Sequence, residues 1–351
     1  MSALQRGPGE GEPNAGAIAP VASGPAALGE RLRRSLAAAG PVLGVLAVVL
    51  LFSTLVPEQF LSLYNFRTVV TQTVIVALGA IGMTFVIASG GIDLSVGSVI
   101  ALVSVVTAIL LRDGSSPGAA LVLGIAAGAA AGAVNGLLVT RLRIGPFIVT
   151  LGTMGIARGV AKWLANEQTV NASAGWLEEL MRKIPDPRWL VVSRGAWVTL
   201  LLAALMAFVL HRTVFGVHVL AIGSSEPTAR LCGVPVDRQK TLVYALGGAF
   251  AGLAGVMQFG RLTVGDPTTA GGLELDVIAA VVIGGASLSG GRGSIAGSLL
   301  GAFFMAVLAN GCTLANVPSY VQEIVVGVII VLAVALDQLR RRRSAAAGSA
   351  A

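Results

Sequence analysis

The sequence predicts an all-α fold, a polytopic bundle of about ten membrane-spanning helices with both termini in the cytoplasm. Two observations support this prediction. Hydrophobic residues make up 55% of the 351 residues and charged residues only 12%, so the chain cannot cover a water-facing surface with charge. In addition, apolar stretches of near-bilayer length recur along the chain from Leu36 to Leu336.

The composition divides the chain into three parts. Residues 1–35, rich in Gly, Pro, Ala and Ser, predict a disordered cytoplasmic leader, and residues 339–351 predict a basic cytoplasmic tail. Residues 36–338 form the expected transmembrane domain. Its first stretch, Leu36–Val56, is as long as a full span and lacks a small-residue cleavage site. We therefore expect a retained helix rather than a signal peptide.

The expected spans follow one another with polar connections between them. The sixth and eighth are shorter than the roughly 20 residues that cross a bilayer unaided, which implies shielded or broken helices. The ten spans are Leu36–Val56, Val69–Ser89, Leu94–Leu111, Ala119–Thr140, Ile144–Leu164, Ala196–Leu210, Thr241–Phe259, Leu275–Leu288, Ile295–Gly311 and Tyr320–Leu336.

The distribution of basic residues predicts the orientation. Placing both termini inside puts most of the 24 Lys and Arg residues in the cytoplasm, as the positive-inside rule requires. This placement also accounts for the net charge of +7, because the chain has no basic or aromatic stripe of the nucleic-acid-binding kind. The longest polar break between spans, residues 213–240, then faces the cytoplasm.

Glycines in two spans predict close helix packing. Small residues at every fourth position let helix backbones approach one another in lipid. They are Gly124, Gly128, Gly132 and Gly136 in the fourth span, and Gly248, Gly252 and Gly255 in the seventh.

Two glycine-rich breaks interrupt the apolar pattern. Ser89–Ser98 reads SGGIDLSVGS and Gly284–Ser294 reads GGASLSGGRGS. Irregular backbone near membrane depth is tolerated only where protein or a water-filled cavity satisfies it, so both breaks are expected to line or gate a pathway. Asp93 is placed to accept a hydrogen bond from the amide of Ser95 or Val96, and we favour this capping role over solute contact.

Nucleotide binding by this chain is not expected. Gly285 and Gly290 have the spacing of a phosphate loop, but Gly291 and Arg292 stand where Lys and Ser or Thr are needed. No catalytic constellation or metal-ligand cluster appears elsewhere. If ATP drives this protein, another subunit must bind it.

Polar residues inside spans raise the free energy when they face lipid. Arg158 and Glu323 are therefore expected to face the bundle interior or a cavity. Helix-to-helix hydrogen bonding is favoured over solute contact for Gln72 and Asn135. The residues expected to line or gate a path are Gln72, Asp93, Ser95, Asn135 and Ser289. Glu274 and Asp276 begin the eighth span at the outer side, where they cap the helix or meet an external partner.

Four segments together carry a family resemblance. They are YNFRTVVTQTVIVALGAIGMTFVIASGGIDLSVGSVIAL (Tyr64–Leu102), PFIVTLGTMGIARG (Pro146–Gly159), AIGSSEPTARLCGV (Ala221–Val234) and LELDVIAAVVIGGASLSGGRGSIAGSLLGAF (Leu273–Phe303). The chain resembles the ribose, xylose and galactose type permeases of bacterial ABC importers over roughly residues 40–338. GGIDLSVGS and ELDVIAAVVIGG are the specific parts of this resemblance.

The resemblance implies a non-enzymatic permease in the bacterial inner membrane that forms the path for a monosaccharide. It implies a second permease copy, identical or paralogous, ATP-binding subunits that hold ATP and Mg, and a periplasmic sugar-binding protein. It also implies that a short helix in the long inner loop seats in a groove of the ATPase. The matching residues of this ATPase-coupling segment are Gly223, Glu226, Ala229, Arg230 and Gly233.

The residues of this segment suit a short helix. Glu226 and Arg230 are four apart and share a helix face as a charge pair, while Gly233 allows the chain to turn back. Ser225 stands where the family usually has Asn, and Pro227 fits a first helical turn, which leaves the start of the helix open.

Two other functions remain open at this point. One is a related ABC permease for a polyol, nucleoside, autoinducer or branched-chain amino acid. The other is a secondary transporter, which is disfavoured because the spans carry few carboxylates or histidines for ion coupling. The sequence does not identify the solute.

Overall fold

The computed structural model describes the backbone of residues 25–348 and the side chains of residues 40–335, 338 and 339. The chain divides into two units, Met1–Ala39 and Gly40–Ala351, and the features below belong to the second, apart from the first part of α1. The first helix, α1, covers Pro25–Leu55 and so begins within the range expected to be a leader. The rest of that expected leader, residues 1–24, lies outside the described residues.

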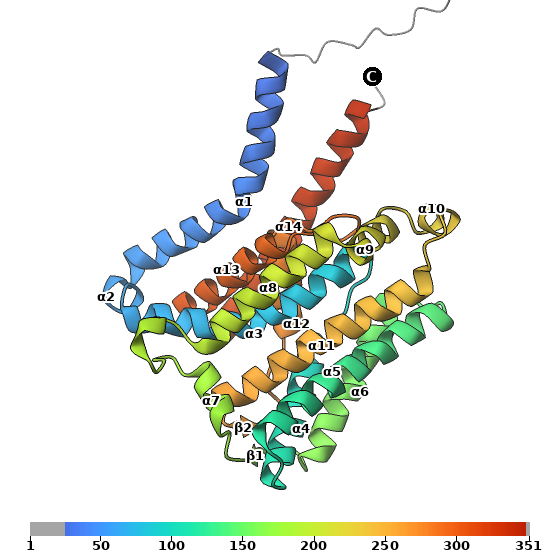
Figure 1. Ribbon diagram of the computed structural model, residues 1–351. Helices are drawn as coiled ribbons and strands as arrows, with labels where there is room; N and C mark the ends of the chain where they lie inside the picture. The colour runs from blue at the N-terminus through green and yellow to red at the C-terminus, as the bar shows by residue number, and fades with distance from the viewer. Residues whose placement is uncertain (1–24, 349–351) are drawn as a thin grey trace, which may run out of the picture. The chain divides into compact units, whose positions relative to one another are not determined.

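The all-α prediction is confirmed, and a helix occupies most of each expected span (Figure 1). After α1 they are α3 (Leu63–Ala88), α4 (Val96–Arg112), α5 (Pro117–Arg141), α6 (Pro146–Leu164), α8 (Arg194–Arg212), α11 (Val236–Leu262), α12 (Leu273–Ile283), α13 (Ile295–Leu314) and α14 (Ser319–Gly348). Among the described residues, α3, α5, α8, α11 and α13 are long and apolar enough to cross a membrane. The side on which the termini lie stays a prediction.

Several short elements lie between these helices. They are α2 (Pro57–Phe60), β1 (Val170–Asn171), α7 (Trp176–Met181), the 3-10 helix η1 (Arg188–Leu190), α9 (Val214–Ser224), α10 (Glu226–Leu231) and β2 (Val264–Gly265). The two strands pair antiparallel, with Val170 opposite Gly265, and so tie the segment after α6 to the end of α11.

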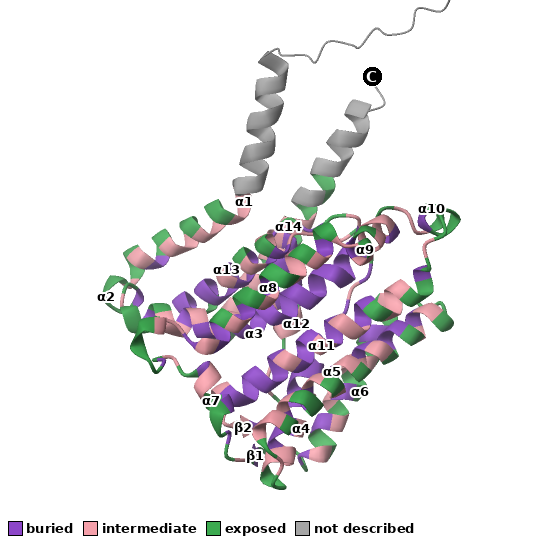
Figure 2. Ribbon diagram, in the orientation of Figure 1, coloured by how far each residue is buried: buried purple, intermediate pink, exposed green. Residues whose placement is uncertain are grey.

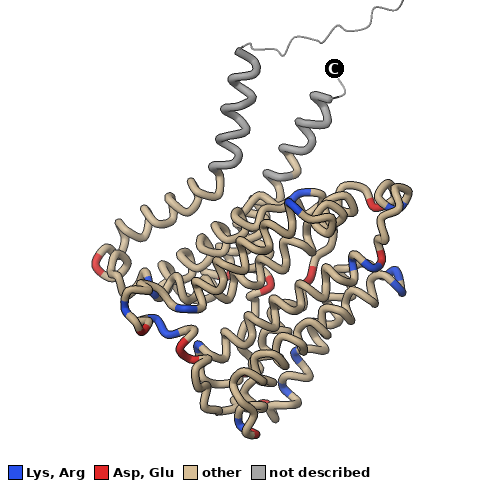
Figure 3. Tube along the Cα trace, in the orientation of Figure 1, with Lys and Arg blue, Asp and Glu red and all other residues tan. Residues whose placement is uncertain are grey.

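Helix α11 packs against α3, α4 and α5, and α13 packs against α3 and α12. Figure 2 shows α3 and α11 buried along much of their length, whereas α5 and α8 each keep an exposed side. In Figure 3 the charged residues gather at helix ends and connections, which leaves the helical body almost uncharged. This pattern suits a bundle whose outer surface meets lipid.

The glycine prediction is confirmed by the packing of α5 on α11. A Cβ added to Gly128 would lie 2.6 Å from the Gly252 Cα, and one added to Gly132 would lie 2.9 Å from the Gly248 Cα. The two backbones therefore touch with no side chain between them. This close approach fixes α11 along its length.

Helix α12 is shorter than the expected eighth span, Leu275–Leu288. It ends at Ile283 because the chain turns at Gly285, whose φ is +92°, a conformation that disfavours side chains. The residues from Gly284 to Ser294 therefore form the irregular connection to α13.

Candidate functional site

Residues 223–240, which we call the coupling segment after the role that the resemblance implies, contain a short helix where one is expected. Ser225 caps α10: its hydroxyl accepts a hydrogen bond from the Thr228 amide, and Pro227 occupies the first turn. Serine caps a helix about as well as asparagine, so the departure from the family pattern leaves the helix intact. Gly233, at a φ of +82°, turns the chain toward α11.

Charged side chains fasten this helix to the start of α11. The Lys240 ammonium donates to Glu226 at 2.5 Å, and the Arg230 guanidinium donates to Glu226 at 3.2 Å and to Asp237 at 2.9 Å. Partial burial of Glu226 disfavours its charged form, but the bonds from Lys240 and Arg230 outweigh this and hold its pKa below 4.5. Hydrogen bonding to Asp237 and then to Glu226 raises the pKa of Arg230.

Two sides of α10 differ in exposure. Ala229 is buried and packs with Ile222 and Val236, which seats the helix on the bundle. Leu231 is 89% exposed at the helix end. The helix is therefore held to the bundle on its Ala229 side and leaves Leu231 open to its surroundings.

Gly223, at the end of α9, joins this segment to both glycine-rich breaks. A Cβ added to Gly223 would collide with the backbone carbonyl of Ala88, just before the first break. The amide of Gly291, in the second break, donates to the same Ala88 carbonyl at 2.9 Å. A Cβ added to Gly290 would lie 2.9 Å from the Cα atoms of both Gly223 and Gly90. We call this meeting of three backbone segments the glycine junction.

Three predicted path residues, Asp93, Ser95 and Asn135, form one buried network. The Ser95 amide and hydroxyl donate to the Asp93 carboxylate at 2.8 and 2.6 Å, and the Asn135 amide donates to the Ser95 hydroxyl at 2.9 Å. The hydrogen bond from the Ser95 amide is one of the two expected, but α4 begins at Val96 with Ser95 as its N-cap residue, so Asp93 lies two residues before the cap position. Ser289 lies apart from this network and is exposed in the second break.

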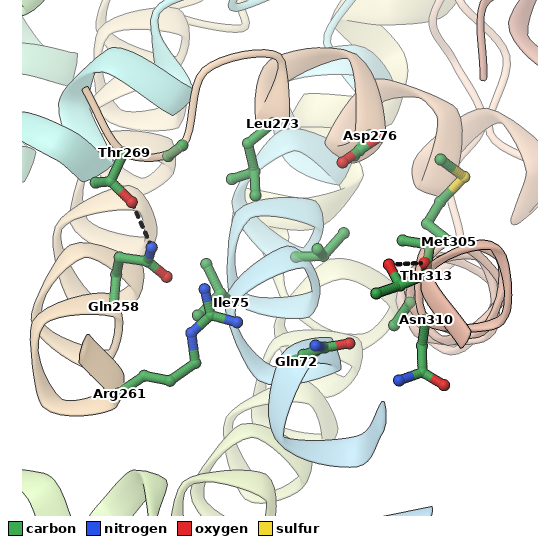
Figure 4. Close-up of a pocket in the computed structure, with 14 residues that line it drawn as sticks. Gln72, Ile75, Gln258, Arg261, Thr269, Leu273, Asp276, Met305, Asn310 and Thr313 are labelled. Carbon is green, nitrogen blue, oxygen red and sulfur yellow. Dashed lines mark hydrogen bonds between the residues drawn. The ribbon is translucent and has the colours of Figure 1, made fainter. Parts of the chain in front are cut away.

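A polar pocket lies at the other end of α11 (Figure 4). Lys240 and Arg261 mark the two ends, about 30 Å apart at 1.5 Å per residue. The pocket has a volume of about 300 Å³ and is lined from α3, α11, α12, α13 and the segment between α11 and α12. We define it by its polar residues, which are Gln72, Gln258, Arg261, Thr269, Asp276, Asn310 and Thr313.

Several polar groups of this pocket have unused hydrogen-bonding capacity. The Gln258 amide donates to the Thr269 hydroxyl at 2.6 Å. By contrast, the buried Arg261 Nε and Asn310 Oδ1 have no hydrogen-bond partner among the described residues. Neither Arg261 nor Asp276 forms an ion pair with a described residue. Buried groups of this kind normally find partners, and the other unpartnered buried atoms among the described residues, such as Gln239 Oε1 and Tyr244 Oη, lie outside the pocket.

The remaining predicted residues take separate places. Glu274 faces α4, where its Oε2 lies against Gly97, whereas Asp276 faces the polar pocket. Arg158 donates to the carbonyls of Pro267 and Thr269 and so holds the connection before α12. Glu323 borders a neighbouring cavity between α12 and α14.

Sequence reasoning identified Gln72, expected Asp276 at the outer side rather than in a pocket, and missed Gln258, Arg261 and Asn310. Gln258 and Asn310 lie inside expected spans and have the same signal as Gln72, a polar side chain in an apolar stretch. What the sequence does not contain is the rotation of each helix, which brings these groups to one cavity. The structure therefore collects polar groups that looked scattered along the chain.

Taken together, these features define an α-helical membrane bundle that has a polar cavity at one end and a charge-fastened surface helix at the other. Residues 65–334 match the family described as "Branched-chain amino acid transport system / permease component". This match covers most of the chain, so the protein belongs to that family and is a transport component.

Among curated proteins, the chain is similar to sugar permeases. It is 39% identical to the ribose import permease protein of Escherichia coli K12, over 86% of this chain and 93% of that protein. It is 40% identical to the ribose import permease protein of Bacillus subtilis 168, over 87% and 93%. It is 39% identical to the L-arabinose ABC transporter permease protein of Azospirillum brasilense, over 85% and 88%. No solved structure matches the chain.

Proposed function

We propose that this chain is the inner-membrane permease subunit of a bacterial ABC importer for a monosaccharide of the pentose class. The relatives named above support this solute class, since they are permeases for ribose and L-arabinose. The polar pocket supports it too, because amide and guanidinium groups suit a polyhydroxylated solute.

The driving energy comes from a separate ATPase subunit in this proposal. The observation that carries the assignment is α10: charge pairs with α11 fasten it, it exposes Leu231, and the preceding Gly223 lies directly against the backbone of both breaks. A partner seated on α10 therefore has a direct connection to the interior. ATP and Mg bind in the partner, and the purified chain should show no saturable ATP binding at physiological concentration.

A binding protein delivers the solute at the opposite end, and a second permease copy completes the assembly. Exposed Leu275 lies in the first turn of α12 at that end, where a delivering protein would meet the bundle, whereas Glu274 turns inward against α4. The family description names branched-chain amino acids, and Arg261 with Asp276 in one cavity offers partners for the two charges of an amino acid. An amino acid is therefore the second candidate solute.

The test uses a host strain without its own pentose importers, supplied with this chain, its ATPase and its binding protein. Uptake of labelled D-ribose, L-arabinose and L-leucine distinguishes the two solute classes. Glu226→Lys and Leu231→Asp should abolish most pentose uptake and ATPase copurification while membrane abundance stays normal. Reversing the exposed Arg182 to Glu, whose one ion pair among the described residues is with Glu178, is the matched control for ATPase copurification. Normal uptake and copurification by both α10 variants would show that the ATPase docks elsewhere.

A further inference from the structure

The unpartnered groups of the polar pocket complement one another. Arg261 only donates hydrogen bonds, Asn310 Oδ1 only accepts them, and the amide of Gln72 does both. A hydroxyl group also donates and accepts, so neighbouring hydroxyls of one small molecule can satisfy both kinds of group. Asn310 is only 7% exposed, and its Oδ1 and the Arg261 Nε are closed off from water, so these two atoms reach a solute only when their side chains turn toward the cavity.

The rest of the lining is apolar. Ile75, Val76, Leu273 and Met305 contribute carbon surface to the same cavity, and Figure 4 shows Ile75 and Leu273 between the polar groups of α11 and those of α13. A monosaccharide presents hydroxyl edges and a C–H face, which matches this alternation. At about 300 Å³ the cavity is at the lower end of the roughly 300–1,000 Å³ range of small-molecule sites. This size suits a single sugar ring.

We infer that the polar pocket is a binding station for the transported monosaccharide, built entirely within one copy of the chain. The inference deepens the proposed function and depends on it for the identity of the solute. Arg261 and Asn310 contact the sugar hydroxyls, and Gln72 approaches from α3. Binding is weak, because a station that holds its solute tightly cannot release it.

The first experiment separates solute binding from folding. Asn310→Leu removes an acceptor that has no partner, so the thermal stability of the permease should stay the same or rise. The rate of pentose uptake by the complete transporter should fall about tenfold, as for the loss of one good hydrogen bond to solute. Arg261→Gln should lower uptake at least as much.

Asn65→Leu is the opposite control. Asn65 is also buried and lies on α3, but its amide already donates to the Phe60 carbonyl at 3.0 Å and it does not line the pocket. Its replacement should lower stability and leave uptake per folded molecule unchanged. Asn310→Leu protein that is stable and takes up pentose at the wild-type rate would overturn the inference.

The second experiment observes occupancy directly. In a complete permease with Cys232 and Cys312 replaced by Ser, Ala306→Cys puts a single thiol into the pocket wall. A small methanethiosulfonate reagent should label it more slowly in high D-ribose or L-arabinose. A second protein, whose only cysteine is native Cys232 on the exposed end of α10, should be labelled at the same rate with and without sugar.

Each outcome decides between the inference and the proposed function. Protection of the pocket thiol by a pentose but not by L-leucine supports the station. Protection by L-leucine alone overturns the solute class. Wild-type pentose uptake without protection, and without an effect of Asn310→Leu, leaves the proposed function standing and overturns the station. Absence of pentose uptake by the wild type contradicts the proposed function, and protection by pentose then still supports the pocket as a sugar site.

Discussion

The two ends of α11 differ in how their charged side chains are partnered. At the Lys240 end, Glu226 is bonded to Lys240 and Arg230, and Arg230 is also bonded to Asp237. At the Arg261 end, the buried Arg261 Nε has no partner among the described residues. Paired charges fix the shape of a surface, whereas unpaired groups in a cavity keep their hydrogen-bonding capacity for another molecule. The contrast supports the proposal that an ATPase contacts the subunit at the Lys240 end and that solute binds at the Arg261 end.

The largest effect is expected from separating α5 from α11, the helix that connects the two ends. Gly132→Leu forces a side chain into the Tyr244 carbonyl and the Gly248 backbone, so α5 and α11 must separate. Overpacking of a tight core typically costs about 1–3 kcal/mol, and here the obstacle is backbone that cannot adopt another rotamer. Membrane abundance and melting temperature should both fall.

Gly118→Leu is the matched control for this change. Gly118 lies on the same helix, and a Cβ there would meet nothing within 4 Å. Its melting temperature should stay close to that of the wild type. Equal stability of the two variants would contradict the close packing of α5 on α11.

A moderate effect should distinguish the Lys240 end of α11, where the charges are paired, from the Arg261 end. A double-mutant cycle of Glu226→Gln and Lys240→Met, followed by unfolding, should show an interaction energy of about 0.5–1 kcal/mol, typical of a partly exposed ion pair. The same cycle with Arg261→Gln and Asp276→Asn should show none, because these two charges are not paired with each other. Similar interaction energies in the two cycles would remove the contrast between the ends.

The smallest effect concerns pH at the coupling segment. The pKa of Glu226 is depressed, so its ion pairs contribute stability that is present above its ordinary pKa of 4.5 and is lost as pH falls through the lower, folded value. Hydrogen exchange of α10, corrected for the intrinsic rate, should therefore be constant between about pH 7 and 5 and rise only below the ordinary pKa. Glu226→Gln should abolish this acid-dependent step. A step near neutral pH would require a different titrating group.

The sequence predicted the parts of the fold that depend on local pattern. Apolar length located the helices, and glycine spacing predicted the close packing of α5 on α11. Sequence spacing also predicted the Glu226 and Arg230 pair. It did not predict α9, which lies in a segment that we expected to be a polar loop around one short helix, although Val214–Ser224 is largely apolar.

The polar pocket was beyond sequence reasoning for a physical reason. Gln72, Arg261 and Asn310 come from three helices separated by long stretches of chain, and their meeting depends on how those helices are rotated in the packed bundle. Periodicity gives the apolar face of a single amphipathic helix, but spans apolar on all sides have no such face to read. Ser289 was expected to line or gate a path because it lies in a glycine-rich break. It is exposed in the structure, and its position in the sequence did not reveal this.

The glycine junction has a mechanical consequence. Where side chains separate two segments, a small displacement is absorbed by a change of rotamer. Gly223, Gly290 and Gly90 meet through backbone atoms, so the junction has no compressible layer. Beside it the Thr84 and Ser298 hydroxyls bond at 2.7 Å and pin α3 to α13, whose far ends carry Gln72 and Asn310. We therefore expect a displacement of α9 to pass to α3 and to the start of α13 by direct backbone contact.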